Sequence, residues 1–136
     1  MVAIQSRKKQ KKLRLLVVED DAGVAYSVCR WLREQEDVRS VLAANTQEAI
    51  EVLRDIIFIE STFDALLVDY NLGDSTGVRV IQEFRDEFPI VPIALMSGSE
   101  DISLERWTRA QDIPLFRKPL KLDQLHDWLE GIRDSA

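Results

Sequence analysis

Charged and hydroxyl side chains stand where several apolar segments of this 136-residue chain end. Taken singly, each has an ordinary explanation, because acids often cap helices and polar residues often occupy turns. Taken together, they include several carboxylates. Two carboxylates about 4 Å apart repel by about 4 kcal/mol at an effective dielectric of 20, so a fold that brings these residues to one place would need a cation or a proton there. The residues are Glu19, Asp20, Asp21, Asp69, Ser97 and Lys118.

The residue types in this set indicate which cation and which reaction. Carboxylates without a neighbouring His or Cys select a hard ion. A site with only a few carboxylates, which leaves positions open for water and phosphate oxygens, favours Mg²⁺ over caged Ca²⁺. Beside such an ion, Asp69 could attack a phosphoryl group while Lys118 neutralises its equatorial oxygens and Ser97 donates a hydrogen bond to one of them. The product would be an aspartyl phosphate.

The elements that must position these residues alternate along the chain. Short apolar runs predict five strands, and the amphipathic stretch after each predicts a helix. The second helix is expected to begin at Asn45, with Glu48 three residues on as in a capping box, and Val78, Ile81 and Phe84 are expected to form the buried stripe of the third. The predicted strands span residues 13–18, 39–44, 63–69, 91–97 and 113–118.

This alternation predicts the fold class. Parallel strands need crossover connections, and helical crossovers cover both faces of the sheet, so we expect a doubly wound α/β sandwich. In such folds, ligands bind outside the carboxyl ends of the strands, where the strand order reverses. The polar residues listed above all follow or end predicted strands, so we expect them to meet at that edge.

Composition is that of one ordinary globular domain, with 46% hydrophobic residues, 31% charged residues and a single cysteine. It excludes collagen-like, disordered and disulfide-stapled classes. No apolar run is long enough for a membrane span or a secretion signal, so we expect a cytoplasmic protein with no membrane partner.

The net charge of −6 is unevenly distributed. Six of the 18 Lys and Arg residues lie within residues 7–14, a stretch without an acid, whereas residues 15–136 hold twelve basic against 24 acidic residues. We therefore divide the chain into a basic leader of residues 1–12, expected to be flexible, and a folded domain of residues 13–136. Because the domain carries a net charge of −12, direct nucleic-acid binding is not expected of it.

Four segments in order, LLVVEDD, LLVDYNLGDSTG, PIALMSG and LFRKPL, resemble the receiver domain of two-component response regulators. The resemblance covers about residues 13–133. It implies a flavodoxin-like sandwich, with a five-stranded parallel sheet in the order 2-1-3-4-5 and five helices. It also implies transfer of a phosphoryl group from a histidine kinase or a histidine phosphotransfer protein, with Mg²⁺ as cofactor.

The resemblance assigns roles to individual residues. Glu19 and Asp20 match the acidic pair that holds Mg²⁺, and Asp69 matches the phosphoacceptor, which also contacts the metal. Asn71 matches the residue whose backbone carbonyl completes the metal site. Gly77 matches the glycine that turns the chain into the third helix.

Two further positions complete the family pattern. Ser97 matches the switch Ser or Thr, and Lys118 with Pro119 matches the Lys-Pro pair, whose peptide bond the family usually holds cis. On phosphorylation, Ser97 would draw its loop inward, and the face formed by the fourth helix, fifth strand and fifth helix would change shape to bind a downstream protein. The resemblance thus implies a signalling domain that assists its own phosphorylation and dephosphorylation, not a multiple-turnover enzyme.

Three positions depart from the family pattern. Gly73 stands where the family usually has proline, so we expect a looser loop there. Gly98 stands where alanine is common, which predicts an open phosphoryl site. Leu115, followed by Phe116, replaces the usual aromatic switch residue and is expected in the core.

Other functions use similar residue types or the same fold. Haloacid dehalogenase-like phosphohydrolases use similar residue types, but their nucleophile precedes the acidic pair and is followed two positions on by a second Asp, where this chain has Asn71. A flavin or nucleotide binder would need a glycine-rich loop where VVEDDAG stands. A further alternative is a pseudo-receiver that binds proteins without phosphorylation. The sequence is also compatible with a homodimer and with a receiver that belongs to a longer protein.

Overall fold

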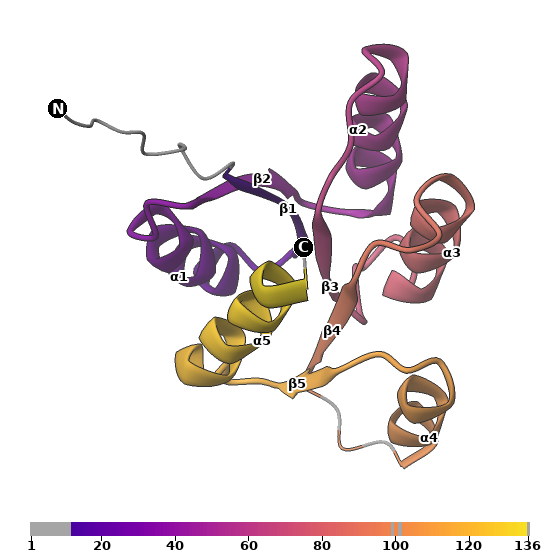
Figure 1. Ribbon diagram of the computed structural model, residues 1–136. Helices are drawn as coiled ribbons and strands as arrows, with labels where there is room; N and C mark the ends of the chain where they lie inside the picture. Colours follow the sequence, from indigo (N-terminus) through magenta and orange to yellow (C-terminus); the bar gives the residue numbers. More distant parts are fainter. Residues whose placement is uncertain (1–11, 99, 101, 136) are drawn as a thin grey trace, which may run out of the picture.

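Strands and helices alternate throughout the part of the chain that the structure describes, residues 12–98, 100 and 102–135 of a computed structural model (Figure 1). The strands are Leu13–Val18 (β1), Val38–Ala43 (β2), Ala65–Asp69 (β3), Ile93–Ser97 (β4) and Leu115–Arg117 (β5). The helices are Ala22–Arg33 (α1), Thr46–Phe58 (α2), Gly77–Glu87 (α3), Ile102–Ala110 (α4) and Leu122–Ser135 (α5). Apart from Lys12, the predicted leader lies outside the described residues.

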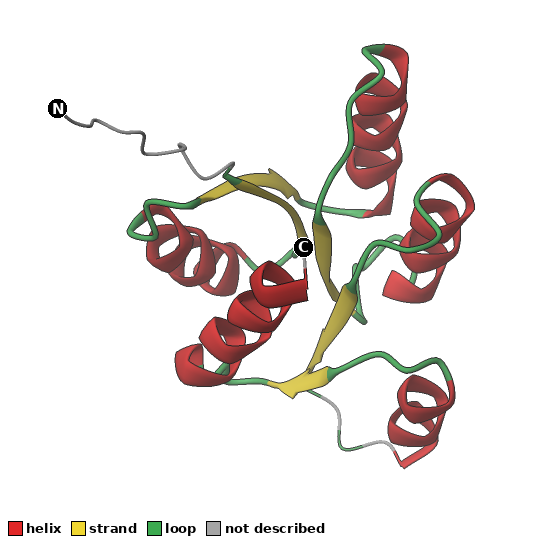
Figure 2. Ribbon diagram, in the orientation of Figure 1, coloured by secondary structure: helices red, strands yellow, loops and turns green. Residues whose placement is uncertain are grey.

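The strands form one parallel sheet in the order β2-β1-β3-β4-β5. Helices cover both of its faces, with α1 and α5 on one side and α2, α3 and α4 on the other (Figures 1 and 2). This arrangement confirms the predicted flavodoxin-like sandwich.

The central strands are buried on both faces, as their continuous apolar sequences predict. Along β1, Leu16 and Val18 enter the core layer beneath α2 to α4, while Leu15 and Val17 enter the layer beneath α1 and α5. All four side chains are fully buried. The two layers together hold the strand ends in fixed positions.

Helices α1 and α2 begin with side-chain caps. The Asp21 carboxylate caps α1 by accepting from the backbone N–H of Val24 at 3.0 Å. Asn45 caps α2 by accepting from the N–H of Glu48 at 2.9 Å, and the Glu48 carboxylate accepts in return from the N–H of Ala44 at 2.7 Å. The capping box predicted at the start of α2 is therefore present in a modified form. Glu48 accepts from the N–H of Ala44 and not from that of Asn45 itself.

The structure corrects some local expectations. The third, fourth and fifth strands are shorter than predicted, since apolar residues flanking them pack in loops outside the ladder. In α3, Val80 is buried with Ile81 and Phe84, whereas Val78 is only half-buried, so its place in the predicted stripe was wrong. Leu115 is half-buried against the core beneath α2 to α4, at the edge of the core and not within it.

None of the described helices combines the length and apolar character that crossing a bilayer requires.

Candidate functional site

Strand register brings the polar residues predicted from the sequence to one edge of the sheet. Val18 of β1 pairs with Val68 of β3, so Glu19 follows β1 at the level where Asp69 ends β3. On the other side, Ser97 of β4 pairs with Arg117 of β5, directly before Lys118. These carboxyl ends lie beside the point where the strand order reverses between β1 and β3.

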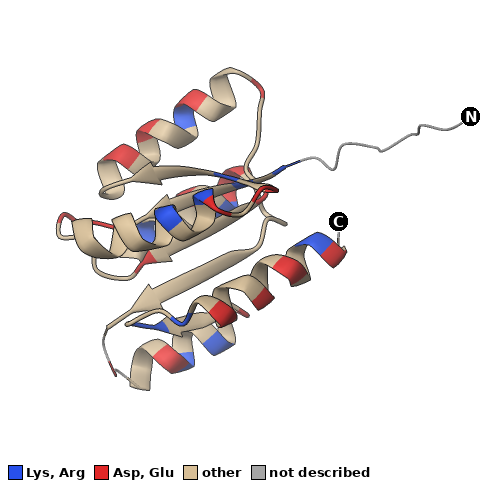
Figure 3. Ribbon diagram, turned by 90° about the vertical axis from the view of Figure 1, so that its left-hand side faces the viewer, with Lys and Arg blue, Asp and Glu red and all other residues tan. Residues whose placement is uncertain are grey.

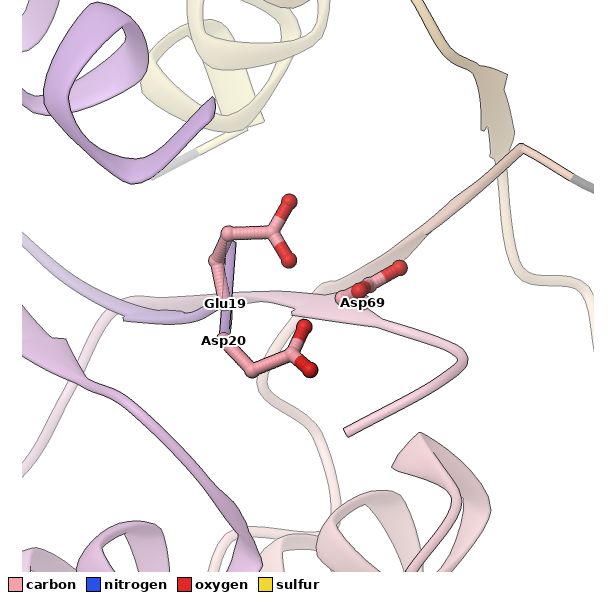
Figure 4. A group of neighbouring side chains, drawn as sticks. All are labelled: Glu19, Asp20 and Asp69. Carbon is pink, nitrogen blue, oxygen red and sulfur yellow. The ribbon is translucent and has the colours of Figure 1, made fainter. Parts of the chain in front are cut away.

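Glu19, Asp20 and Asp69 form a cluster of acids at this edge (Figure 4). One carboxylate oxygen from each lies within 4.8 Å of the others. Glu19 is 1% exposed and Asp69 is 4% exposed, whereas Asp20 faces solvent. The cluster therefore has a buried base and an open side.

Lys118 is the cation that the acids share. Its Nζ lies 2.5 Å from Glu19 Oε1 and 3.1 Å from Asp69 Oδ2. The side chain reaches the site from the end of β5, where the peptide bond to Pro119 is cis, as the family resemblance implies. One ammonium balances one of the three carboxylates, so the cluster keeps an excess of negative charge.

Burial and neighbouring groups together raise the pKa values of both Glu19 and Lys118. Burial raises the pKa of Glu19, as does the adjacent Asp69 carboxyl, and Lys118 lowers it only partly, so the pKa is raised from 4.5 to about 7. For Lys118, burial lowers the pKa, but hydrogen bonds and charge from Glu19 and Asp69 outweigh that effect and raise it. Lys118 is thus held as a cation, while Glu19 can exchange a proton near neutral pH.

The cluster fits a hard divalent cation. Among the described residues, no hydrogen-bond donor meets the buried Oε2 of Glu19, which leaves a desolvated oxygen without a partner. An oxygen in that position, beside two further carboxylates and no nitrogen or sulfur ligand, suits Mg²⁺. Glu19, Asp20 and Asp69 can supply its carboxylate ligands.

The remaining predicted residues lie around the cluster. Ser97 is 2% exposed, and its carbonyl accepts from the N–H of Lys118 at 2.9 Å. Asn71 is exposed two residues after Asp69, and its side-chain oxygen accepts from the N–H of Gly73 at 3.2 Å. A Cβ on Gly98 would meet no described atom within 4 Å, which agrees with the predicted open site.

Gly77 has a more specific role than a turn. A Cβ at this position would lie 2.3 Å from the backbone oxygen of Asp69, a distance that real side chains do not adopt. The N–H of Gly77 also donates to the carbonyl of Tyr70 at 2.6 Å. The missing side chain therefore lets α3 begin directly against the backbone of the candidate phosphoacceptor.

Sequence reasoning missed Asp74. Its carboxylate accepts hydrogen bonds from the backbone of α2, a helix that begins 28 residues earlier in the chain. No local pattern around Asp74 signals this contact, because the partners meet only in the folded sheet.

The chain is similar to proteins of known family. The family described as the response regulator receiver domain matches residues 15–130, and the chain belongs to this family. It is therefore a receiver domain of two-component signalling, a signalling domain and not a classical enzyme. Receiver domains generally bind Mg²⁺ at an acidic pocket, and interact with histidine kinases and downstream effectors.

Two curated relatives are longer proteins. The chain is 27% identical over 90 residues to the transcriptional regulatory protein CiaR of Streptococcus pneumoniae, covering 66% of this chain and 37% of CiaR. It is 27% identical over 119 residues to the transcriptional regulatory protein CitT of Bacillus subtilis, covering 86% of this chain and 50% of CitT. The chain thus spans half or less of the length of these relatives.

Solved receiver structures share the fold. A CheY-like receiver domain from Methanospirillum hungatei is 19% identical with a TM-score of 0.74, over 93% of this chain and 100% of that one. The non-phosphorylated HemR receiver domain of Leptospira biflexa is 23% identical with a TM-score of 0.76, over 89% of this chain and 94% of that one.

Proposed function

We propose that Asp69 accepts a phosphoryl group from the phosphohistidine of a histidine kinase or a histidine phosphotransfer protein, in a Mg²⁺-dependent reaction. The observation that carries the proposal is the Lys118 ammonium held 2.5 Å from Glu19 and 3.1 Å from Asp69. A cation in this place can bring a phosphate oxygen and an attacking carboxylate together despite their like charges, and the remaining negative charge of the three acids supports the requirement for Mg²⁺.

The transfer exchanges one bond to phosphorus for another. An oxygen of Asp69 attacks phosphorus, the bond from phosphorus to the histidine nitrogen breaks, and that nitrogen keeps the electron pair and takes a proton. Lys118 pairs with the equatorial oxygens, and the Ser97 hydroxyl donates a hydrogen bond to one of them. The product is an aspartyl phosphate.

Glu19, Asp20, Asp69 and the backbone carbonyl of Asn71 are proposed to hold the Mg²⁺ ion. When bound, the ion supplies Lewis-acid neutralisation of charge on the phosphoryl oxygens. The family resemblance implies a separate role for the exposed side chain of Asn71, in how readily water reaches the phosphate during dephosphorylation.

The proposed output is a change in the face formed by α4, β5 and α5, which binds a downstream protein or a second copy of the chain. Ser97 and Lys118 both lie at the strand ends next to this face, so movement of either is transmitted to it. The phosphoryl group shifts the population between two forms by the difference in its contacts with them.

The proposal also covers domain limits and location. Residues 13–136 form the receiver, preceded by a basic leader at 1–12. Charged residues lie mainly on helices and loops around largely uncharged strands (Figure 3). The net charge of −12 over residues 15–136 argues against direct contact with nucleic acid. A cytoplasmic location, without a membrane partner, is also part of the proposal.

The test is phosphorylation by a small donor. Incubation with Mg²⁺ and acetyl phosphate, followed by intact mass spectrometry, is expected to add one phosphoryl group to the wild type. The gain should vanish in Asp69→Asn and after metal chelation, and should persist in Asp55→Asn, which alters an exposed acid on α2. No gain in the wild type would favour a pseudo-receiver, and rapid turnover of unrelated phosphate esters would favour a hydrolase.

A further inference from the structure

Asp74 joins the loop after β3 to the beginning of α2. Its Oδ1 accepts from the backbone N–H of Thr46 at 3.2 Å, and its Oδ2 accepts from that of Gln47, also at 3.2 Å. Removal from water raises the pKa of Asp74, but the hydrogen bonds from α2 lower it by more. The pKa of Asp74 is therefore below its ordinary value. Both oxygens are thus held by a helix distant in the sequence.

These two bonds complete the capping of α2. The first N–H groups of a helix have no partner within it. Asn45 satisfies the N–H of Glu48, and Asp74 satisfies those of Thr46 and Gln47, while the backbone oxygen of Asn45 accepts from Ala49. The cap of α2 is therefore shared between its own preceding residue and a residue from another loop.

The loop that Asp74 anchors borders the acid cluster. Gly73 adopts φ +76°, and a Cβ there would lie 3.6 Å from Asp20 Oδ2. Two residues earlier, the side chain of Asn71 accepts from the N–H of Gly73, and Asn71 also forms an isolated bridge with Thr76. The segment thus makes a tight bend beside the open side of the cluster, and Asp74 ties that bend to α2.

We infer that Asp74 is a positioning residue for the metal site, which holds the loop carrying the Asn71 carbonyl in place by anchoring it to α2. This inference rests on the proposed function, because it assigns the loop to the same site. Asp74 lies outside the cluster of Glu19, Asp20 and Asp69 that is proposed to hold the metal. It acts by restricting the loop before the metal binds, so that binding does not have to order it.

The experiment compares Asp74→Ala with Asn45→Ala. Each variant removes a side-chain cap from the same end of α2, but only Asp74→Ala releases the loop. Mg²⁺ affinity is measured by calorimetry, hydrogen exchange of residues 70–77 is measured without metal, and thermal unfolding reports stability. We expect Asp74→Ala to weaken Mg²⁺ binding about tenfold and to speed exchange in the loop, with Asn45→Ala within about twofold of the wild type in both.

Asp74→Asn provides a graded version of the same test, because one of its two acceptor oxygens is lost while the side-chain size is kept. It should fall between the wild type and Asp74→Ala, and it carries the comparison with Asn45→Ala if the alanine variant does not fold.

The inference is overturned if the Asp74 variants bind Mg²⁺ as the wild type does, or if Asn45→Ala weakens binding equally, since the effect would then belong to the helix. A wild type that neither binds Mg²⁺ nor accepts a phosphoryl group would refute the proposed function itself. The wild-type measurements therefore separate failure of the function from failure of the inference.

Discussion

The two sides of the site are built differently. On the carboxylate side, every residue of β3 is buried, and Glu19 follows β1 into the same core. On the lysine side, β5 has only three residues, all half-buried, and α4 buries only Leu104 and Thr108 among its described residues. Segments with few buried contacts move at lower cost than segments inside the core. The acids are therefore held rigidly, while the side that would transmit a signal is held more loosely.

Two glycines show the same difference in packing between the two sides. Gly77 is enclosed against the Asp69 backbone, whereas a Cβ on Gly98 would meet no described atom within 4 Å. Adding one methyl group should therefore destabilise the protein strongly at Gly77 and very little at Gly98, which gives the most direct test of the comparison.

The largest expected effect is that of Gly77→Ala. Because its Cβ would lie 2.3 Å from the oxygen of Asp69, α3 must shift, and we expect the free energy of unfolding to fall by about 3 kcal/mol. Gly98→Ala should change it by no more than about 0.5 kcal/mol. Urea unfolding of both variants measures the difference, and similar losses in the two would contradict the proposed asymmetry.

The next effect concerns the buried acid. With its pKa raised from 4.5 to about 7, Glu19 keeps a proton in the folded state that the unfolded state releases, so between these pH values stability falls as pH rises. Without metal, Glu19→Gln should therefore be more stable than the wild type at pH 8, by about 2 kcal/mol, and nearly equal to it near pH 4.5.

Thermal unfolding at the two pH values tests this expectation. Added Mg²⁺ should stabilise the wild type at pH 8 and should stabilise Glu19→Gln much less, and its removal by chelation should reverse that gain. A pH-independent effect of the substitution would show that the Glu19 charge is not the cause.

Replacing the shared cation should separate two functions of the site. Lys118→Met removes the ammonium that competes for Glu19 and Asp69, so Mg²⁺ affinity should rise, while the rate of phosphorylation by acetyl phosphate should fall about tenfold or more. Lys121→Met, which alters an exposed lysine nearby, is the matched control and should change neither. Parallel loss of metal binding and phosphorylation would mean that Lys118 supports the structure of the cluster instead.

The smallest expected effect lies on the loosely held side. Arg117 of β5 pairs with Glu105 of α4, and their side chains are 34% and 46% exposed. Exposed ion pairs contribute little, so Glu105→Gln should lower the free energy of unfolding by no more than about 0.5 kcal/mol. A loss above about 1 kcal/mol in urea unfolding would mean that α4 is held as firmly as the carboxylate side.

Much of this architecture could be predicted because it depends on local patterns. The strands are mostly apolar, and the residues expected to do chemistry end or directly follow them, so a parallel sheet must bring Glu19, Asp69 and Lys118 to one edge. Capping of α2 by Asn45 was predictable for the same reason, since donor and acceptor are three residues apart.

Features that depend on distant partners could not be predicted in this way. The bonds of Asp74 to α2 and the approach of α3 to the Asp69 backbone exist only once separate elements have packed. The short, half-buried β5 was overestimated because IPLFRK is apolar enough for a longer strand, although only its middle residues join the ladder.

Gly73 limits how this loop could be exchanged for one from another family member. Proline is confined to φ near −65°, whereas Gly73 lies at +76°, so a proline placed there would force the backbone onto another path. A chimera that imports the usual proline must therefore import its neighbours as well. At this bend the backbone conformation requires glycine, so the single substitution Gly73→Pro is not tolerated.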